Sequence, residues 1–141
     1  MPDAEASLEL RVHPASAGPT LVYVPGLHGD WTLVGSFREA LAHRATFIEI
    51  TYPRTLTWTL ADYGRAVAAA LLRQGVTTGW LLAESFGSQV AWALLADPAR
   101  SWQANGVVFA GGFVRYGPRW LVRAGERAFR VIPNRRLSPG R

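Results

Sequence analysis

The sequence predicts an α/β protein in which a mostly parallel β-sheet carries helices on both faces. Short apolar segments of strand length alternate along the chain with amphipathic segments of helix length. Turns that contain glycine or proline separate the two kinds of segment, as element boundaries require. Strands that alternate with helices of ten or more residues form parallel sheets, because each helix returns the chain to the edge where the previous strand began.

Five segments have the composition of strands. Residues 7–12 alternate between polar and apolar side chains, which predicts an edge strand with one solvated face. The other four segments are almost continuously apolar, as strands buried on both faces are. They are residues 20–24, 46–51, 80–83 and 106–110.

Four segments are expected to be helical. Phe37 and Leu41 lie four residues apart in the first, and Gly75 follows the second as a typical helix-ending residue. Pro98 ends the third, because proline disfavours helical backbone in the residue before it. The four are residues 34–43, residues 60–74, a segment that contains residues 90–95, and the residues from Pro118 onward.

Length and composition limit the possible function classes. The chain has 141 residues, enough for one domain, and 49% of them are apolar, enough for a core. It has no cysteine, and its three histidines lack metal-ligand spacing, so we predict no metal and no cofactor. The N-terminus lacks the apolar run of a signal peptide, and no apolar run is long enough to span a membrane. These features predict a cytoplasmic protein.

The net charge of +5 is unevenly distributed. Residues 115–141 contain eight arginines and one acidic residue, Glu126, whereas the rest of the chain is slightly acidic. Several of these arginines share one side of the predicted helix from Pro118, which is the arrangement of a solvated helix face. We therefore expect no nucleic-acid partner.

A buried strand, a sharp turn and a helix follow one another around Ser85. Residues 80–83 are apolar, Glu84 to Gly87 form the turn, and apolar residues then recur at helical spacing. A serine on such a turn is lifted off the end of the sheet with its hydroxyl exposed. Its strained backbone needs small residues two positions away, here Ala83 and Gly87. The pattern indicates a nucleophile, although it also fits a serine that caps an ordinary helix.

Two backbone N–H groups are candidates for binding the oxyanion of an acyl-transfer reaction. One is that of Phe86, directly after the serine, at the N-terminus of a helix whose dipole favours negative charge. The other is that of Leu27, where Gly26 and Gly29 let the backbone turn an amide inward. Right-handed crossovers place both loops at the carboxyl edge of the sheet, where active sites of α/β proteins lie.

Three motifs resemble the α/β-hydrolase superfamily in their order: Val-Pro-Gly-Leu-His-Gly at residues 24–29, Tyr-Pro at residues 52–53 and Leu-Ala-Glu-Ser-Phe-Gly at residues 82–87. Over residues 7–113 the chain is most similar to small bacterial hydrolases with a Pro-Gly-Leu-Asp-Gly loop and a Glu-Ser-Phe turn. The resemblance implies that Ser85 attacks an ester, thioester or related acyl group. It also implies that Leu27 and Phe86 supply the oxyanion amides, while His28 stands where these hydrolases carry aspartate.

The chain departs from the superfamily pattern after Ser85. The resemblance implies an acid and a histidine after the serine, yet no histidine follows and the only later acids are Asp97 and Glu126. We therefore expect an incomplete α/β-hydrolase fold, a fragment that lacks the triad acid and histidine and is inactive alone. Residues 1–112 are then the N-terminal part of the core, and residues 113–141 begin a basic cap or lid helix.

His28 and Glu84 are the titratable residues nearest in sequence to the predicted oxyanion loop and the serine. We expect both at the rim of the pocket rather than as a replacement base, and Glu84 to bond to neighbouring backbone. A serine hydroxyl without a base is a weak nucleophile.

Two functions are consistent with these features. The first is a serine hydrolase that forms an acyl-enzyme from a small-molecule carboxylic ester or thioester. The second is a non-catalytic module on the same scaffold that binds an acyl or acidic ligand. This alternative stays open because a fold does not determine a function.

The last predicted strand suggests self-association. Val107, Val108 and Phe109 form an apolar strand without charge or proline at a predicted sheet edge, and such an edge pairs with further strands.

Overall fold

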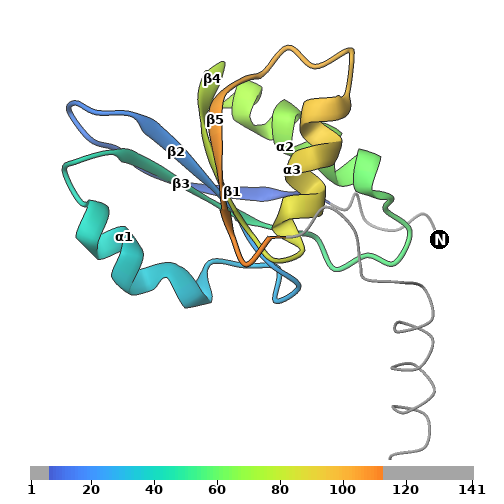
Figure 1. The fold of residues 1–141 in the computed structure, drawn as a ribbon, viewed down its shortest axis with the longest axis horizontal. Helices are drawn as coiled ribbons and strands as arrows, with labels where there is room; N and C mark the ends of the chain where they lie inside the picture. Colours follow the sequence, from blue (N-terminus) through green and yellow to red (C-terminus); the bar gives the residue numbers. More distant parts are fainter. Residues whose placement is uncertain (1–6, 113–141) are drawn as a thin grey trace, which may run out of the picture.

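A computed structural model of the protein describes residues 7–112, which form a five-stranded sheet with helices on both faces (Figure 1). The strand order is β1-β3-β2-β4-β5. The strands are β1 (Glu9–His13), β2 (Thr20–Val24), β3 (Thr46–Thr51), β4 (Thr78–Glu84) and β5 (Gln103–Ala110). The helices are α1 (Gly35–Leu41), α2 (Leu60–Arg73) and α3 (Gly87–Ala96), and a short 3-10 turn, η1 (Thr32–Val34), leads into α1.

The sheet is mostly parallel, as the sequence predicts. β2 pairs in parallel with β3 on one side and with β4 on the other, and β5 extends the sheet beyond β4. β1 forms the opposite edge, antiparallel to β3. Because the chain passes from β2 to β3 and then returns to the other side of β2, the loops after β2 and β4 meet at a topological switch point. Ligands of open α/β sheets bind at such a point.

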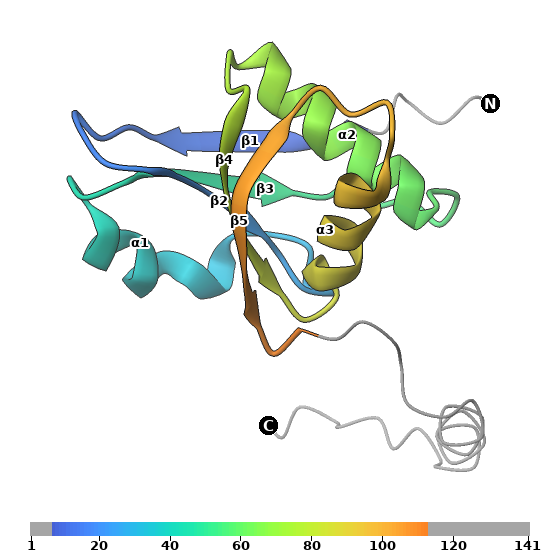
Figure 2. The same ribbon diagram turned by 45° about the horizontal axis from the view of Figure 1, so that its top comes forward.

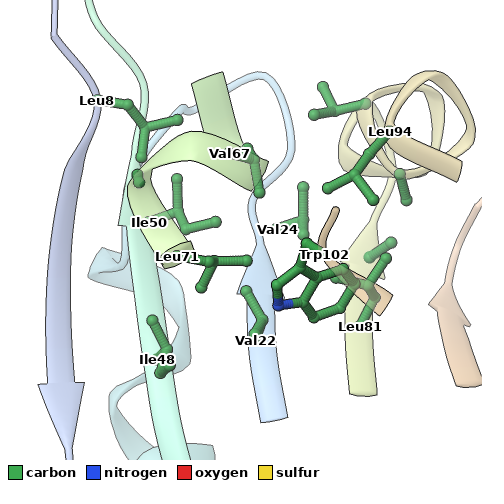
Figure 3. Close-up of a cluster of buried hydrophobic side chains, with 14 of the residues drawn as sticks. Leu8, Val22, Val24, Ile48, Ile50, Val67, Leu71, Leu81, Leu94 and Trp102 are labelled. Atoms are coloured by element: carbon green, nitrogen blue, oxygen red, sulfur yellow. The ribbon is translucent and has the colours of Figure 1, made fainter. Parts of the chain in front are cut away.

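Helices α2 and α3 pack together on one face of the sheet, and α1 covers the other (Figure 2). The larger core lies between the sheet and the α2–α3 pair, where alternate residues of the central strands meet the apolar sides of both helices (Figure 3). Gly64 lets the two helices approach closely, because a Cβ on it would lie 2.8 Å from the backbone nitrogen of Leu94. The labelled core residues are Leu8, Val22, Val24, Ile48, Ile50, Val67, Leu71, Leu81, Leu94 and Trp102.

Three elements differ most in length from the prediction, while β1 and α2 are each one residue shorter than expected. α1 is shorter than the expected helix over residues 34–43, because η1 precedes it and the chain leaves the helix before His43, whose backbone is left-handed (φ +67°). β4 begins at Thr78 and β5 at Gln103, earlier than predicted, because these two residues pair with each other. Because the side chains of Thr78 and Gln103 are polar, the apolar pattern does not predict that the strands begin at these residues.

None of the helices in residues 7–112 is long and apolar enough to cross a membrane. The basic cap helix expected from Pro118, in the segment assigned to residues 113–141, lies outside the described residues.

β3 carries a buried carboxylate that the apolar pattern did not predict. Glu49 is fully buried, and Arg38 of α1 contacts one of its carboxylate oxygens at 2.6 Å. His13 of β1 lies 2.9 Å from the other oxygen, and Arg11 adds a longer ion pair of 3.8 Å. A buried charge requires partners of this kind. The cluster therefore links the edge strand β1 and the helix α1 to Glu49 of β3.

Candidate active site

Ser85 lies at the sharp turn between β4 and α3, in the left-handed backbone region (φ +47°). Its N–H donates to the carbonyl oxygen of Ala110 (3.0 Å), and its own carbonyl accepts from the backbone N–H of Ser88 (3.0 Å). A left-handed backbone is uncommon outside glycine and reports local strain. The N-cap residue of α3 is Phe86 and not Ser85, and the start of the helix has no side-chain cap hydrogen bond. The geometry therefore disagrees with a serine that simply caps the helix.

Gly87 explains why the turn needs a small residue two positions after Ser85. A Cβ on Gly87 would lie 2.1 Å from the carbonyl oxygen of Val24 and 2.7 Å from that of Pro25. On the other side of the turn, Ala83 is fully buried and pairs with Val24. The turn is thus packed directly onto the end of β2.

The loop after β2 is fixed by backbone and side-chain hydrogen bonds. The N–H of Gly29 donates to the carbonyl of Gly26 (3.0 Å), and the N–H of Tyr52 donates to the carbonyl of Gly29 (2.8 Å). The buried hydroxyl of Tyr52 donates to the carbonyl of Pro25 (3.0 Å), and burial raises the pKa of that hydroxyl. A Cβ on Gly26 would lie 3.4 Å from the Cβ of Ser85. The two loops therefore meet, as the sheet topology predicts.

The backbone N–H groups of Leu27 and Phe86 flank this meeting point. Neither donates a hydrogen bond to another group within residues 7–112. The side chain of Leu27 is 78% exposed, so this residue faces the open side of the loop. Unpaired N–H groups at a loop and at a helix N-terminus are suited to bind negative charge.

A pocket of about 550 Å³ opens beside the two loops. Leu27 and His28 line it from the loop after β2, Phe86 from the turn, and Arg54 from the segment after β3. The ring of Phe86 meets the rings of Tyr52 and Tyr63 edge to face, with centroids 6.2 and 5.9 Å away. One wall of the pocket is therefore a packed aromatic cluster, and the opposite rim is polar.

His28 and Glu84 meet through a third side chain, Tyr23. His28 is exposed and lines the pocket, and its Nε2 lies 3.2 Å from the Tyr23 hydroxyl. That hydroxyl donates a short hydrogen bond to Glu84 Oε2. Glu84 was expected to bond to neighbouring backbone; its partner is instead this tyrosine, and it does not line the pocket described above. Burial and the Glu84 carboxylate raise the pKa of Tyr23 strongly.

Sequence analysis does not identify the two tyrosines whose hydroxyls contact the loop after β2. Tyr23 lies inside the apolar run of residues 20–24, and Tyr52 belongs to the Tyr-Pro pair. A hydroxyl-bearing residue within one position of the carboxyl end of a predicted strand is the available signal. Such a position brings a phenol to the edge where the loops converge.

Comparison with solved structures gives the relatives of this fold. The esterase RhEst1 from Rhodococcus sp. ECU1013 is 27% identical over 78% of this chain and 43% of its own, with a TM-score of 0.67. A carboxylesterase structure from Nitrososphaera gargenis is 12% identical over 96% of this chain and 52% of its own, with a TM-score of 0.72. A hydrolase from Pseudomonas aeruginosa PA01 is 23% identical over 86% of this chain and 48% of its own, with a TM-score of 0.69.

The chain thus spans about half the length of the solved proteins that it matches. No protein-family model matches the sequence, and no curated protein matches it. The shared part includes the parallel sheet, with helices on its two faces. The chain has part of the α/β-hydrolase fold, and the solved proteins that it resembles are esterases and hydrolases of that superfamily.

Proposed function

We propose that this chain carries the nucleophile and the oxyanion hole of a serine hydrolase that acts on a carboxylic ester or thioester. One observation supports this most directly: Ser85, on a left-handed turn, has its Cβ 3.4 Å from the position of a Cβ on Gly26. The hydroxyl of a serine held there borders the loop that carries the Leu27 amide.

In this proposal Ser85 Oγ attacks the carbonyl carbon of the substrate, and the bond from that carbon to the alcohol oxygen or thiol sulfur breaks. The serine hydroxyl proton ends on the departing alcohol or thiol, and an acyl-enzyme remains. The carbonyl oxygen gains negative charge in the transition state, and the N–H groups of Leu27 and Phe86 receive it. Because both groups are held by the fold before the substrate arrives, they need no reorganisation during the reaction. Each such donor contributes about 3 kcal/mol of transition-state stabilisation.

The expected substrate is a small molecule. The pocket beside the turn, which Phe86 lines and Ser85 does not, has room for one. Its aromatic side chains suit an acyl or alkyl group, and its lining also contains polar groups. The solved relatives include an esterase and a carboxylesterase, which favours an ester over other acyl compounds. We assign residues 1–112 to the N-terminal part of the core and residues 113–141 to the start of a basic cap or lid helix.

A fluorophosphonate probe tests the nucleophile directly, because labelling needs no turnover. We expect labelling of the folded 141-residue chain that is slow, because no histidine follows the serine in the sequence, and that maps to Ser85 by peptide mass spectrometry. Ser85→Ala should abolish it. Ser36→Ala, which removes an exposed hydroxyl on α1, is the matched control and should retain it. Folded protein that stays unlabelled but binds an acyl ligand would instead support a non-catalytic binding module.

A further inference from the structure

The hydroxyl of Tyr23 joins three segments at the carboxyl edge of the sheet. Tyr23 is almost fully buried near the end of β2, and its hydroxyl contacts Glu84 at the end of β4. The same hydroxyl lies 3.2 Å from Nε2 of His28, in the loop after β2. The contact therefore links the loop that carries Leu27 to the residue directly before Ser85.

The proton count of this group of side chains assigns the tautomer of His28. A phenol has one proton, and Tyr23 donates it to the Glu84 carboxylate. Burial and the neighbouring carboxylate raise the pKa of Tyr23, so the hydroxyl keeps that proton. Its oxygen can then only accept from His28, which requires a proton on Nε2 of the imidazole. Nδ1 of the neutral imidazole is left as a hydrogen-bond acceptor.

The free Nδ1 faces the space next to Ser85. A Cβ on Gly26 would lie 3.3 Å from His28 Nδ1 and 3.4 Å from Ser85 Cβ. The acceptor edge of the imidazole and the serine side chain therefore border the same small volume, which the absence of a side chain on Gly26 keeps open.

We propose that Tyr23 is a positioning residue of this site: its hydroxyl, held by Glu84, fixes His28 and thereby the loop that presents the Leu27 amide to Ser85. Tyr52 holds the same loop from its other side through Pro25. The inference rests on the proposed function, since it assigns a role relative to Ser85. It goes further in giving the site a fixed acceptor, Nδ1 of His28, beside the serine.

Two readouts on the full chain test the proposal. The first is the ¹⁵N spectrum of the histidine imidazoles, with His28→Gln used to assign the signals of His28. Wild-type protein should show the Nε2–H tautomer alone, and Tyr23→Phe should shift the spectrum toward the mixture of tautomers that a free neutral imidazole shows. The second is the rate of fluorophosphonate labelling at Ser85, which should fall about tenfold or more in Tyr23→Phe, because small displacements of reacting groups are costly.

Conservative substitution separates positioning from mere packing. Glu84→Gln keeps an oxygen that accepts from Tyr23 and should retain both the tautomer and the labelling rate, whereas Glu84→Leu should behave like Tyr23→Phe. Thr78→Val removes a strand hydroxyl at the opposite end of β4, bonded to Asn105, and serves as the control with unchanged labelling. The Glu84 pair also decides the question if Tyr23→Phe does not fold.

The failures of the two proposals are distinguishable. Folded wild-type protein without any Ser85 labelling contradicts the proposed function, while the imidazole spectrum still reports whether Tyr23 fixes His28. An unchanged tautomer and unchanged labelling in Tyr23→Phe overturn the positioning role of Tyr23 and leave the proposed function standing.

Discussion

Gly87 lies against Val24 so closely that a Cβ on the glycine would be 2.1 Å from the valine carbonyl oxygen. This contact joins the first residue of α3 to the last residue of β2. Because the obstructing atoms belong to the backbone of a central strand, they cannot move aside as a flexible side chain would. The direction in which the chain leaves Ser85 is therefore tied to the end of β2.

Gly87→Ala should lower the free energy of unfolding by about 2 kcal/mol or more, because overpacking against rigid neighbours is destabilising. Urea denaturation measures it. The control is Gly35→Ala at the start of α1, where the nearest atom to a new Cβ outside the helix backbone is an Arg38 guanidinium nitrogen at 3.6 Å. That variant should be unchanged or more stable by about 0.5 kcal/mol. Equal stability of the two variants would contradict the close packing of the turn.

Gly26→Ala should slow the reaction of Ser85 while changing the free energy of unfolding little. The added methyl would lie 3.3 Å from His28 Nδ1 and 3.4 Å from Ser85 Cβ, so it occupies the space between them. The imidazole of His28 is exposed and can shift by a few tenths of an ångström, so we expect a loss of stability below about 1 kcal/mol. Phosphonate labelling of Ser85 should nevertheless fall at least tenfold. Labelling at the wild-type rate would contradict the view that the reaction of Ser85 needs the space beside Gly26.

The sequence predicted those features that neighbouring residues encode. The strand, turn and helix around Ser85 are contiguous in the chain, so their apolar periodicity and small residues were sufficient to predict the turn. The contact between Tyr23 and Glu84 joins residues 61 positions apart, and no periodicity encodes it. The burial of Glu49 likewise depends on His13, 36 positions away, and on the placement of α1 over β3. Tyr23 and Glu49 each lie within an apolar run, and the partners that explain their burial are distant in the sequence, so the local pattern could not predict their roles.

Arg38→Met should be strongly destabilising. It removes the closest ion-pair partner of Glu49, a fully buried carboxylate. Among residues 7–112, only His13 and Arg11 then remain to compensate the charge. We expect a loss of about 2 kcal/mol or more in the free energy of unfolding. The matched control is Arg65→Met, which breaks an exposed pair with Asp62 and should cost no more than about 0.5 kcal/mol. Similar losses of unfolding free energy in Arg38→Met and Arg65→Met would contradict the view that burial of Glu49 makes its ion pair important for stability.

Val108→Lys should reduce self-association. β5 is an edge strand of the sheet, Val108 and Phe109 are 48% and 41% exposed, and residues 103–110 contain neither charge nor proline. Such an edge pairs with further strands, and we expect the partner to be a second copy of this chain. Sedimentation should show concentration-dependent association that Val108→Lys weakens. Val12→Lys, on the other edge strand, is the control, and an equal effect there would argue against pairing through β5.

The start of α2 supplies a prediction about acid stability. Thr59 and Asp62 form a capping box, in which the N–H of Asp62 donates to the Thr59 hydroxyl at 3.2 Å. The Thr59 hydroxyl and N–H donate in turn to the Asp62 carboxylate at 2.6 and 2.8 Å. These bonds, and to a smaller extent Arg65, lower the pKa of Asp62 below its usual 3.8. The folded state therefore favours the ionised carboxylate.

Because the pKa of Asp62 is lower in the folded than in the unfolded state, its contribution to stability is complete above the usual value. It is lost as the pH falls through the lowered one. Asp62→Asn cannot titrate, so its free energy of unfolding should decline less steeply than that of wild type between about pH 4 and pH 2. Thr59→Ala removes the hydroxyl that lowers the pKa and should reduce the slope as well. Denaturant unfolding at a series of pH values measures this, and parallel curves for wild type and Asp62→Asn would refute the role of the capping box.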